Sequence, residues 1–376
     1  MSLQYGCADE ALTGAAAPRF IHILRIQTME AFAVRFTRTM EAPHRIALIE
    51  ASITSIGAHL DAGVSRRELA RLLHTGVWHR IGKGYVVEMT TWANCCVEQS
   101  HLARVIVAAK ESRGVPIFSH QSAAALLGLP FWGCTDSPPH VISLSAHGRS
   151  DSLVRHELDV PEGDITESWG FAHTTPNRTL VDLSMLSLAP ESLVATADVV
   201  LGRSARSGRH VDSDAAGQWH EEMAARTLAA AGKRGVRLLR TIVDFADARA
   251  DSPLESVSRW RFHEFNISVI PQFEVPARNG GWYFVDFFLP DHGVFGECDG
   301  RTKYLDPALR GNLNVGQMVL QEKDREDWLA ATTSSRFIRW GAREAWTARR
   351  FGSMLTAFRV PFTTKVPRSR LLTHAE

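Results

Sequence analysis

Acidic residues recur along the last third of the chain, where a helix and strands are expected. Asp286 lies in the apolar run 283–289, and a carboxylate in such a strand is costly unless it meets a partner or a metal ion. Glu297 and Asp299 lie on the next expected strand, and their separation of two residues places both side chains on one face. Glu255 could add a third carboxylate from the preceding helix.

Oxygen ligands of this kind favour a hard divalent cation. Mg²⁺ and Mn²⁺ bind through a few carboxylates and keep water and phosphate oxygens as further ligands. Such an ion can polarise a phosphodiester and activate a water molecule. We therefore expect a Mg²⁺ or Mn²⁺ site whose ligands are Glu255, Asp286, Glu297 and Asp299.

The elements expected around these acids have a definite order. Ser252-Pro253 begins a helix, because proline suits a first helical turn. Apolar runs and period changes then predict three strands, a long helix and a last strand, at 269–275, 283–289, 294–299, 317–331 and 337–340.

This order and its motifs resemble the Vsr-like branch of the PD-(D/E)xK superfamily, over roughly residues 251–358. The motifs are Glu255, Val285-Asp286-Phe287, Glu297-Cys298-Asp299-Gly300, Lys303-Tyr304 and the charged run 322–327. The resemblance implies an α/β restriction-endonuclease-like domain that cleaves phosphodiesters, with the metal held by Glu255, Asp286 and Glu297.

The chain departs from this family at the lysine, because Asp299 occupies its position. Negative charge grows on the scissile phosphate in the transition state, so a cation is needed there. It would have to come from Lys303 or Lys323. In the alternative interpretation the fold is inactive, and its acids are satisfied by Arg325, Arg339 or backbone donors.

A basic segment lies near the start of the chain. Apolar spacing predicts a helix over 44–60, a second helix follows the capping residue Ser65, and a glycine-rich turn at 82–84 predicts a hairpin. This outline is typical of a winged helix, whose second helix enters the major groove while the hairpin tip reaches the backbone. The expected DNA-binding residues are Arg66, Arg67, Arg71, Arg80 and Lys83. Ordinary surface arginines are the alternative.

Residues 63–69 and 75–86 resemble the N-terminal winged helix of the AbiEi family, and 119–130 and 174–182 are similar to the region that follows it. This resemblance implies an antitoxin and transcriptional autoregulator of a type IV toxin-antitoxin system, with double-stranded DNA and a cognate toxin as partners. Within these motifs, we expect Arg178 and Asp182 to form a structural pair and His120 to be a capping or core residue.

The composition sets limits on these interpretations. A net charge of +1 over 376 residues exerts no strong overall pull on nucleic acid, so binding must come from local patches. Five cysteines without a CxxC motif favour a reducing cytoplasm, and no run is apolar enough for a membrane span. The expected organisation is a poorly ordered tail (1–41), a winged helix (42–92), an α+β middle domain (93–203), a linker (204–218), and a helical lead-in with the endonuclease fold (219–376).

The sequence thus predicts a cytoplasmic DNA-binding protein with a metal-dependent endonuclease domain, linked to toxin-antitoxin, phage-defence or DNA-repair roles. The alternative is a non-catalytic antitoxin or transcriptional autoregulator that uses the nuclease-like fold only for binding.

Overall fold

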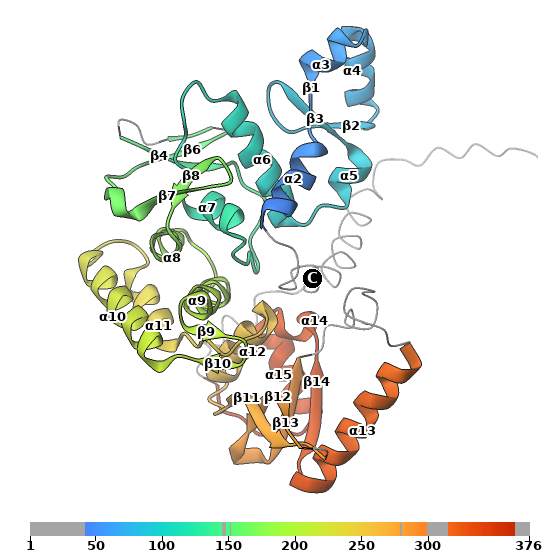
Figure 1. The fold of residues 1–376 in the computed structure, drawn as a ribbon, viewed down its shortest axis with the longest axis vertical. Helices are drawn as coiled ribbons and strands as arrows, with labels where there is room; N and C mark the ends of the chain where they lie inside the picture. Colours follow the sequence, from blue (N-terminus) through green and yellow to red (C-terminus); the bar gives the residue numbers. More distant parts are fainter. Residues whose placement is uncertain (1–41, 145–147, 151, 279, 299–314, 365–376) are drawn as a thin grey trace, which may run out of the picture.

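Helices and small separate sheets make up the protein, in the mixed α and β composition that the sequence predicts (Figure 1). The computed structural model describes residues 42–144, 148–150, 152–278, 280–298 and 315–364. The predicted tail and two predicted site residues, Asp299 and Lys303, lie outside these ranges. No helix within them is both long and apolar enough to cross a membrane.

The first unit packs short helices on a three-stranded sheet of order β1-β3-β2. Ser55 and Ser65 begin α3 and α4, because each hydroxyl accepts a backbone N–H of the first turn. The single helix expected over 44–60 is interrupted, since Thr54 and Ser55 pair with β3 instead. The elements are α2 (Ala42–Ala51), β1 (Thr54–Ser55), α3 (Ile56–Asp61), α4 (Arg66–His74), β2 (Trp78–Arg80), β3 (Tyr85–Glu88) and α5 (Met89–Ala93).

The next unit contains an alanine-rich helix, α7, buried between α6, α8 and β4. The small side chains of Ala123, Ala124 and Ala125 are buried and let these neighbours approach closely. β4 runs parallel to β6, and β7 forms a hairpin with β8. The elements are α6 (Val97–Glu111), α7 (His120–Leu127), β4 (His140–Ser143), β5 (Gly148–Arg149), β6 (Val154–Glu157), η1 (Glu162–Asp164), β7 (Ile165–Ser168) and β8 (Phe171–Thr174).

A helical layer follows, in which α8, α10 and α11 pack around α9. Arg178 and Asp182 form the predicted pair, with Nε donating to Oδ1 at 2.8 Å. Residues 204–218 differ from the expected linker, because they include a two-stranded hairpin and the start of α10. The elements are α8 (Pro176–Met185), α9 (Pro190–Ala205), β9 (Arg206–Ser207), β10 (His210–Val211), α10 (Ser213–Ala229) and α11 (Val236–Phe245).

One hydrophobic cluster joins these first three units, from Ile46 in α2 to Trp260 in α12 (Pro253–Glu264). Trp219 and Met223 of α10 and Leu239 of α11 belong to it. The helical lead-in that the sequence assigns to the nuclease-like domain therefore packs with the middle of the chain instead.

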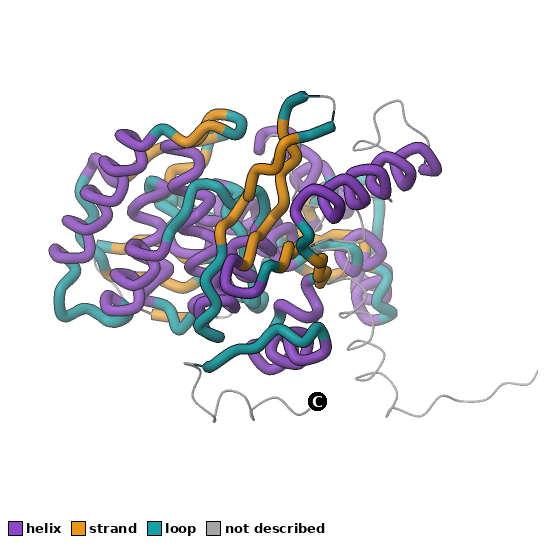
Figure 2. The backbone as a smooth tube through the Cα atoms, turned by 90° about the horizontal axis from the view of Figure 1, so that it is seen from below, coloured by secondary structure: helices purple, strands orange, loops and turns teal. Residues whose placement is uncertain are grey.

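The last unit has the predicted order of a helix, three strands, a helix and a strand. Its sheet has the order β11-β12-β13-β14, with β14 parallel to β13, and Figure 2 shows the long β11–β12 hairpin extending outward beside α13. The elements are α12 (Pro253–Glu264), β11 (Ile270–Pro276), β12 (Trp282–Leu289), η2 (Pro290–His292), β13 (Val294–Cys298), α13 (Val315–Thr333), β14 (Arg336–Trp340), α14 (Ala342–Ala345) and α15 (Ala348–Ala357).

The two faces of this sheet bury different clusters. Phe262 of α12 packs with Phe287 and Trp340 on one face. Leu329 of α13 packs with Val285 on the other. The sheet is therefore a middle layer between α12 and α13.

A buried ion pair joins α12 to α9. The guanidinium Nη2 of Arg259 donates to both carboxylate oxygens of Asp198, at 2.8 and 3.0 Å. Asp198 also accepts the backbone N–H of Asp247 at 2.8 Å, and Arg259 donates to the carbonyl of Phe245. Both charges are thus compensated, as burial of ions requires.

The start of α11 yields a stability prediction. Gly235 has a φ of +80°, and an added Cβ would lie 1.8 Å from the carbonyl oxygen of Ser184. Gly232 has a φ of +82° but open space around its Cβ position. Gly232→Ala should lower the free energy of unfolding by about 1–2 kcal/mol, from backbone strain alone. Gly235→Ala should cost roughly 1–3 kcal/mol more, from the clash. Urea denaturation measures both, and equal losses would contradict the predicted clash.

Candidate metal centre

Two of the predicted acids meet where α12 begins beneath the sheet. Ser252 caps α12, since its hydroxyl accepts the N–H of Glu255 at 3.2 Å, and Pro253 occupies the first turn. This cap places Glu255 within the first turn of the helix. Its carboxyl group lies with the side chains of Asp286 from β12 and Cys298 from β13, and one ligand atom of each lies within 4.8 Å of the others.

Glu255 is a buried carboxyl group with three donors around it. Oε2 accepts the backbone N–H of Asp251 and the side-chain amide of Gln272, both at 2.8 Å, while Oε1 accepts the hydroxyl of Ser252 at 2.9 Å. Burial, and secondly the charge of Asp286, raise the pKa of Glu255 to about 8. The metal-free site therefore holds a proton at neutral pH that a cation would displace.

Asp286 is held by the neighbouring strand. Its Oδ2 accepts the backbone N–H of Cys298 at 2.9 Å, and the thiol of Cys298 donates to the same oxygen at 3.4 Å. A cation bound between Glu255 and Asp286 would therefore have the sulfur of Cys298 as a neighbour.

An irregularity in β12 turns Asp286 toward α12. In a regular strand Val285 and Phe287 would share a face. Here Val285 packs on the α13 side and Phe287 on the α12 side, so the strand changes face at Asp286. Gln272, the residue of β11 at this level, has a φ of 51°, which is uncommon outside glycine. The register continues on both sides, as Pro271 pairs with Phe287 and Phe273 with Val285.

Glu297 does not join the cluster that the sequence predicts. Glu297 follows Phe295 on the α13 face, so its carboxylate meets two arginines instead. Oε1 accepts Nη2 of Arg325 at 2.7 Å, and Oε2 accepts Nη2 of Arg339 at 2.9 Å. Arg325 and Arg339 are the partners expected for these acids in the alternative sequence interpretation, in which the nuclease-like fold is inactive. Because side chains alternate along β13, Cys298 and not Glu297 lies beside Asp286.

Of the two predicted lysines, only Lys323 lies within the described residues. Lys323 is exposed on α13, which covers the face of the sheet opposite α12. Lys303, like Asp299, lies outside the described residues.

The donor set fits a divalent cation. The carboxyl groups of Glu255 and Asp286 supply oxygen ligands at fixed positions. The side-chain amide of Gln272 orients the carboxyl group of Glu255. Oxygen ligands suit Mg²⁺ and Mn²⁺, whereas a thiolate favours softer ions. A bound ion would supply Lewis-acid chemistry and an activated water molecule.

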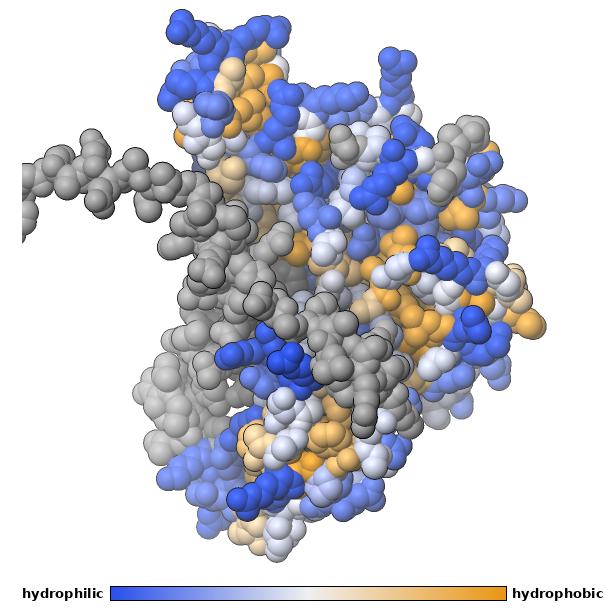
Figure 3. Space-filling model, turned by 180° about the vertical axis from the view of Figure 1, so that it is seen from behind, coloured by the Kyte–Doolittle hydropathy of each residue, from blue (hydrophilic) through white to orange (hydrophobic). Residues whose placement is uncertain are grey.

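The five predicted basic residues lie on α4 and the following hairpin. Arg66, Arg67, Arg80 and Lys83 have exposed side chains. Arg71 differs, because its guanidinium pairs with Glu68 one turn earlier on the same helix. Figure 3 shows hydrophilic side chains gathered at this end of the molecule, beside a smaller hydrophobic patch.

Sequence reasoning missed two residues of the metal cluster. The position of Cys298 between two acidic residues was a sequence signal for it. In regular paired strands, however, Asp286 would share a face with Glu297 and not with Cys298. Nothing in the sequence pointed to Gln272, because its role depends on an uncommon backbone conformation that its residue type does not predict.

A scan against protein-family models finds no match for the chain, and a search of curated proteins finds no significant match.

The raised pKa of Glu255 predicts how stability depends on pH. Between about pH 4.5 and 8 the folded state keeps a proton that the unfolded state releases, so the free energy of unfolding falls as pH rises. Glu255→Gln carries no titrating group and should make this fall shallower. Urea denaturation at several pH values in a chelator measures the slope. Glu274→Gln, an exposed carboxylate on β11, is the control, and equal slopes in all three proteins would contradict the burial argument.

Proposed function

We propose that residues 251–358 form a nuclease fold of the PD-(D/E)xK type, which hydrolyses phosphodiesters of double-stranded DNA with Mg²⁺ or Mn²⁺. The observation that carries this proposal is the convergence of Glu255 and Asp286, from a capped helix and a strand, beneath one face of a mixed sheet. The two carboxyl groups repel each other when both are ionised, and a bound cation would stabilise the ionised pair. In this proposal Glu255 and Asp286 are ligands, and Cys298 lies beside the ion.

We further propose that the first unit is a winged helix that brings this domain to DNA. Support comes from the order of α3, α4, β2 and β3, with β3 at the centre of the small sheet. Arg66 and Arg67 lie at the N-terminus of α4, where the helix dipole also favours phosphate. Lys83 lies in the turn between β2 and β3, the position that reaches the DNA backbone in a wing.

A second candidate function is a non-catalytic antitoxin or transcriptional autoregulator of the AbiEi type, with a toxin protein as partner. One observation favours it. Glu297, the acid that the family resemblance makes a ligand, is compensated by Arg325 and Arg339. In both candidates the protein works in the cytoplasm, in keeping with the thiols of Cys95, Cys96 and Cys134.

Plasmid cleavage separates the two candidates. The purified protein should nick or linearise plasmid DNA in Mg²⁺ or Mn²⁺, and Asp286→Asn should slow cleavage about 100-fold or more, because it removes a metal ligand. Glu274→Gln controls for the loss of a carboxylate elsewhere on the sheet. Glu297→Gln should keep the metal site, since Glu297 contacts arginines. If Asp286→Asn leaves cleavage unchanged, Asp286 is not a ligand of the catalytic ion and the nuclease proposal is wrong. If none of the proteins cleaves the plasmid, the non-catalytic candidate is favoured.

DNA affinity as a function of salt tests the first unit. The double variant Arg66→Ala with Arg67→Ala should bind duplex DNA more weakly, and its plot of log affinity against log salt should flatten by about 0.9 per lost phosphate contact. Arg71→Ala is the matched control on the same helix, because Glu68 already neutralises Arg71. Fluorescence anisotropy over a salt series measures the slopes. Identical slopes for the double variant and the wild type would remove α4 from the DNA interface.

A further inference from the structure

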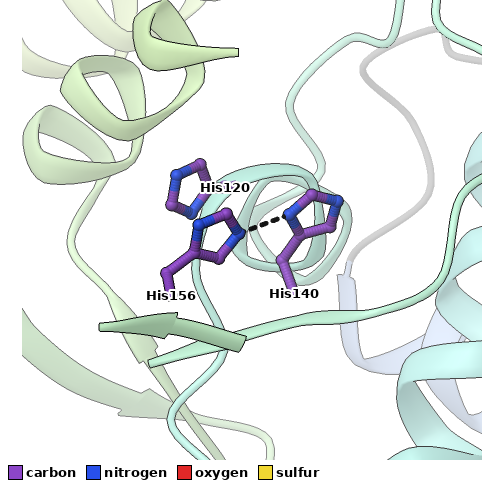
Figure 4. Close-up of side chains that lie close together, drawn as sticks. All are labelled: His120, His140 and His156. Carbon is purple, nitrogen blue, oxygen red and sulfur yellow. Dashed lines mark hydrogen bonds between the residues drawn. The ribbon is translucent and has the colours of Figure 1, made fainter. Parts of the chain in front are cut away.

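Three histidines from three elements of the second unit lie together, away from the acidic centre formed by Glu255, Asp286 and Cys298. Figure 4 shows His120, His140 and His156 with their rings together at the start of α7. One nitrogen of each ring lies within 4.8 Å of the others. Nδ1 of His140 and Nε2 of His156 are 2.8 Å apart, and the rings of His120 and His156 stack with centroids 3.7 Å apart.

The fold places these rings on one surface. In the parallel pair β4–β6, His140 is level with Val154 and Ile142 with His156. His140 and His156 therefore project from the same face, because positions two apart along a strand share a face. α7 packs on β4 and begins with His120.

His120 is held in an uncommon backbone conformation. Its φ is 52°, in the left-handed region that non-glycine residues rarely occupy, although it is the first residue of α7. Such strain persists only where the surroundings enforce it, and it often accompanies a functional role. Here it accompanies the contact between the His120 ring and His156.

Each of these rings has a nitrogen that could bind a metal shared with the other two. Nδ1 of His120 is 2.9 Å from the hydroxyl of Ser119, an arrangement that fixes the ring and leaves Nε2 for a ligand. The nitrogen of His140 that faces the cluster is Nδ1, so an ion shared by the three rings would bind there and would replace the contact between Nδ1 of His140 and Nε2 of His156.

We propose that His120, His140 and His156 form a second metal site, selective for a borderline divalent ion of the Zn²⁺ class. Imidazole suits Zn²⁺, Cu²⁺ and Ni²⁺, whereas Mg²⁺ prefers oxygen ligands. Three protein ligands leave a fourth tetrahedral position for water. The bound ion would tie the start of α7 to β4 and β6.

Binding requires a modest rearrangement of the rings. Nitrogens around tetrahedral zinc lie about 3.3 Å apart, given Zn–N bonds of about 2.0 Å. The present limit of 4.8 Å therefore calls for shifts of roughly 1.5 Å or less. His120 and His156 must also leave their parallel stack, because a metal lies in the plane of each imidazole that it binds.

Two neighbouring histidines mark the boundary of the site. His101 uses both ring nitrogens, with Nδ1 3.1 Å from the carbonyl of Ser137 and Nε2 3.0 Å from the hydroxyl of Ser122. His173 on β8 is buried, and its Nδ1 is 2.9 Å from the carbonyl oxygen of Thr174. His173 belongs to no cluster that could hold a metal within the described ranges, and it serves as a matched control.

The experiment counts Zn²⁺ in a protein whose acidic centre has been removed. Glu255→Gln with Asp286→Asn forms the background, so that Zn²⁺ bound there does not contribute. This protein should bind one Zn²⁺ per chain by calorimetry and elemental analysis, and Zn²⁺ should raise its melting temperature. Adding His140→Gln and His156→Gln should abolish both effects, whereas adding His173→Gln should leave the bound Zn²⁺ unchanged.

Co²⁺ provides a readout that does not depend on the histidine variants folding. In the protein with unaltered histidines, Co²⁺ in this site should show visible ligand-field bands without the near-ultraviolet thiolate charge-transfer band that Cys298 would produce. Absence of bound Zn²⁺ in the background protein would overturn the proposal. So would Zn²⁺ that persists after both histidines are replaced, or a Co²⁺ spectrum of thiolate type.

Discussion

The ion pair between Arg259 and Asp198 is the constraint on which the placement of the acidic centre depends. Both groups are buried, and each has one further backbone partner, which restricts the geometry of the pair. Removal of either partner from such a pair leaves an uncompensated buried charge, at a typical cost of 3–5 kcal/mol. Because Arg259 lies one turn after Glu255, the same contact that joins α12 to α9 helps to set the position of the Glu255 carboxyl group.

This junction makes the last unit part of a larger body. Arg261, also on α12, pairs with Glu191 of α9 and Glu264 of its own helix. The core cluster that begins in α2 reaches Trp260 on the same helix. α12 therefore belongs to two cores at once, with Phe262 in the cluster beneath the C-terminal sheet. A DNA-binding unit at one end and a nuclease fold at the other would be connected through packed helices, with few flexible joints.

Local patterns predicted the elements well and their assembly less well. Ser65, Ser252 and Pro253 marked helix starts correctly, because capping depends on neighbours in the sequence. Apolar runs located β11, β12 and β13, and the sequence correctly predicted that Glu255 and Asp286 lie together. The pairing of Asp286 with Cys298 escaped prediction, since one irregular residue in β12 reverses which side chains share a face. The histidine cluster escaped for a related reason, because strand register between β4 and β6 cannot be read from either segment alone.

The hairpin of β9 and β10 alters which parts of this chain can change freely. Arg209, in the loop between these two strands, donates to the amide oxygen of Gln272 and forms an ion pair with Asp251. The side-chain amide of Gln272 and the backbone N–H of Asp251 both donate to Glu255. Polar, glycine-containing surface turns usually accept insertions and substitutions with little effect. Here a length change would disturb the donors around a buried carboxyl group. A change in this turn would therefore act on the acidic centre, although none of the turn's residues belongs to that centre.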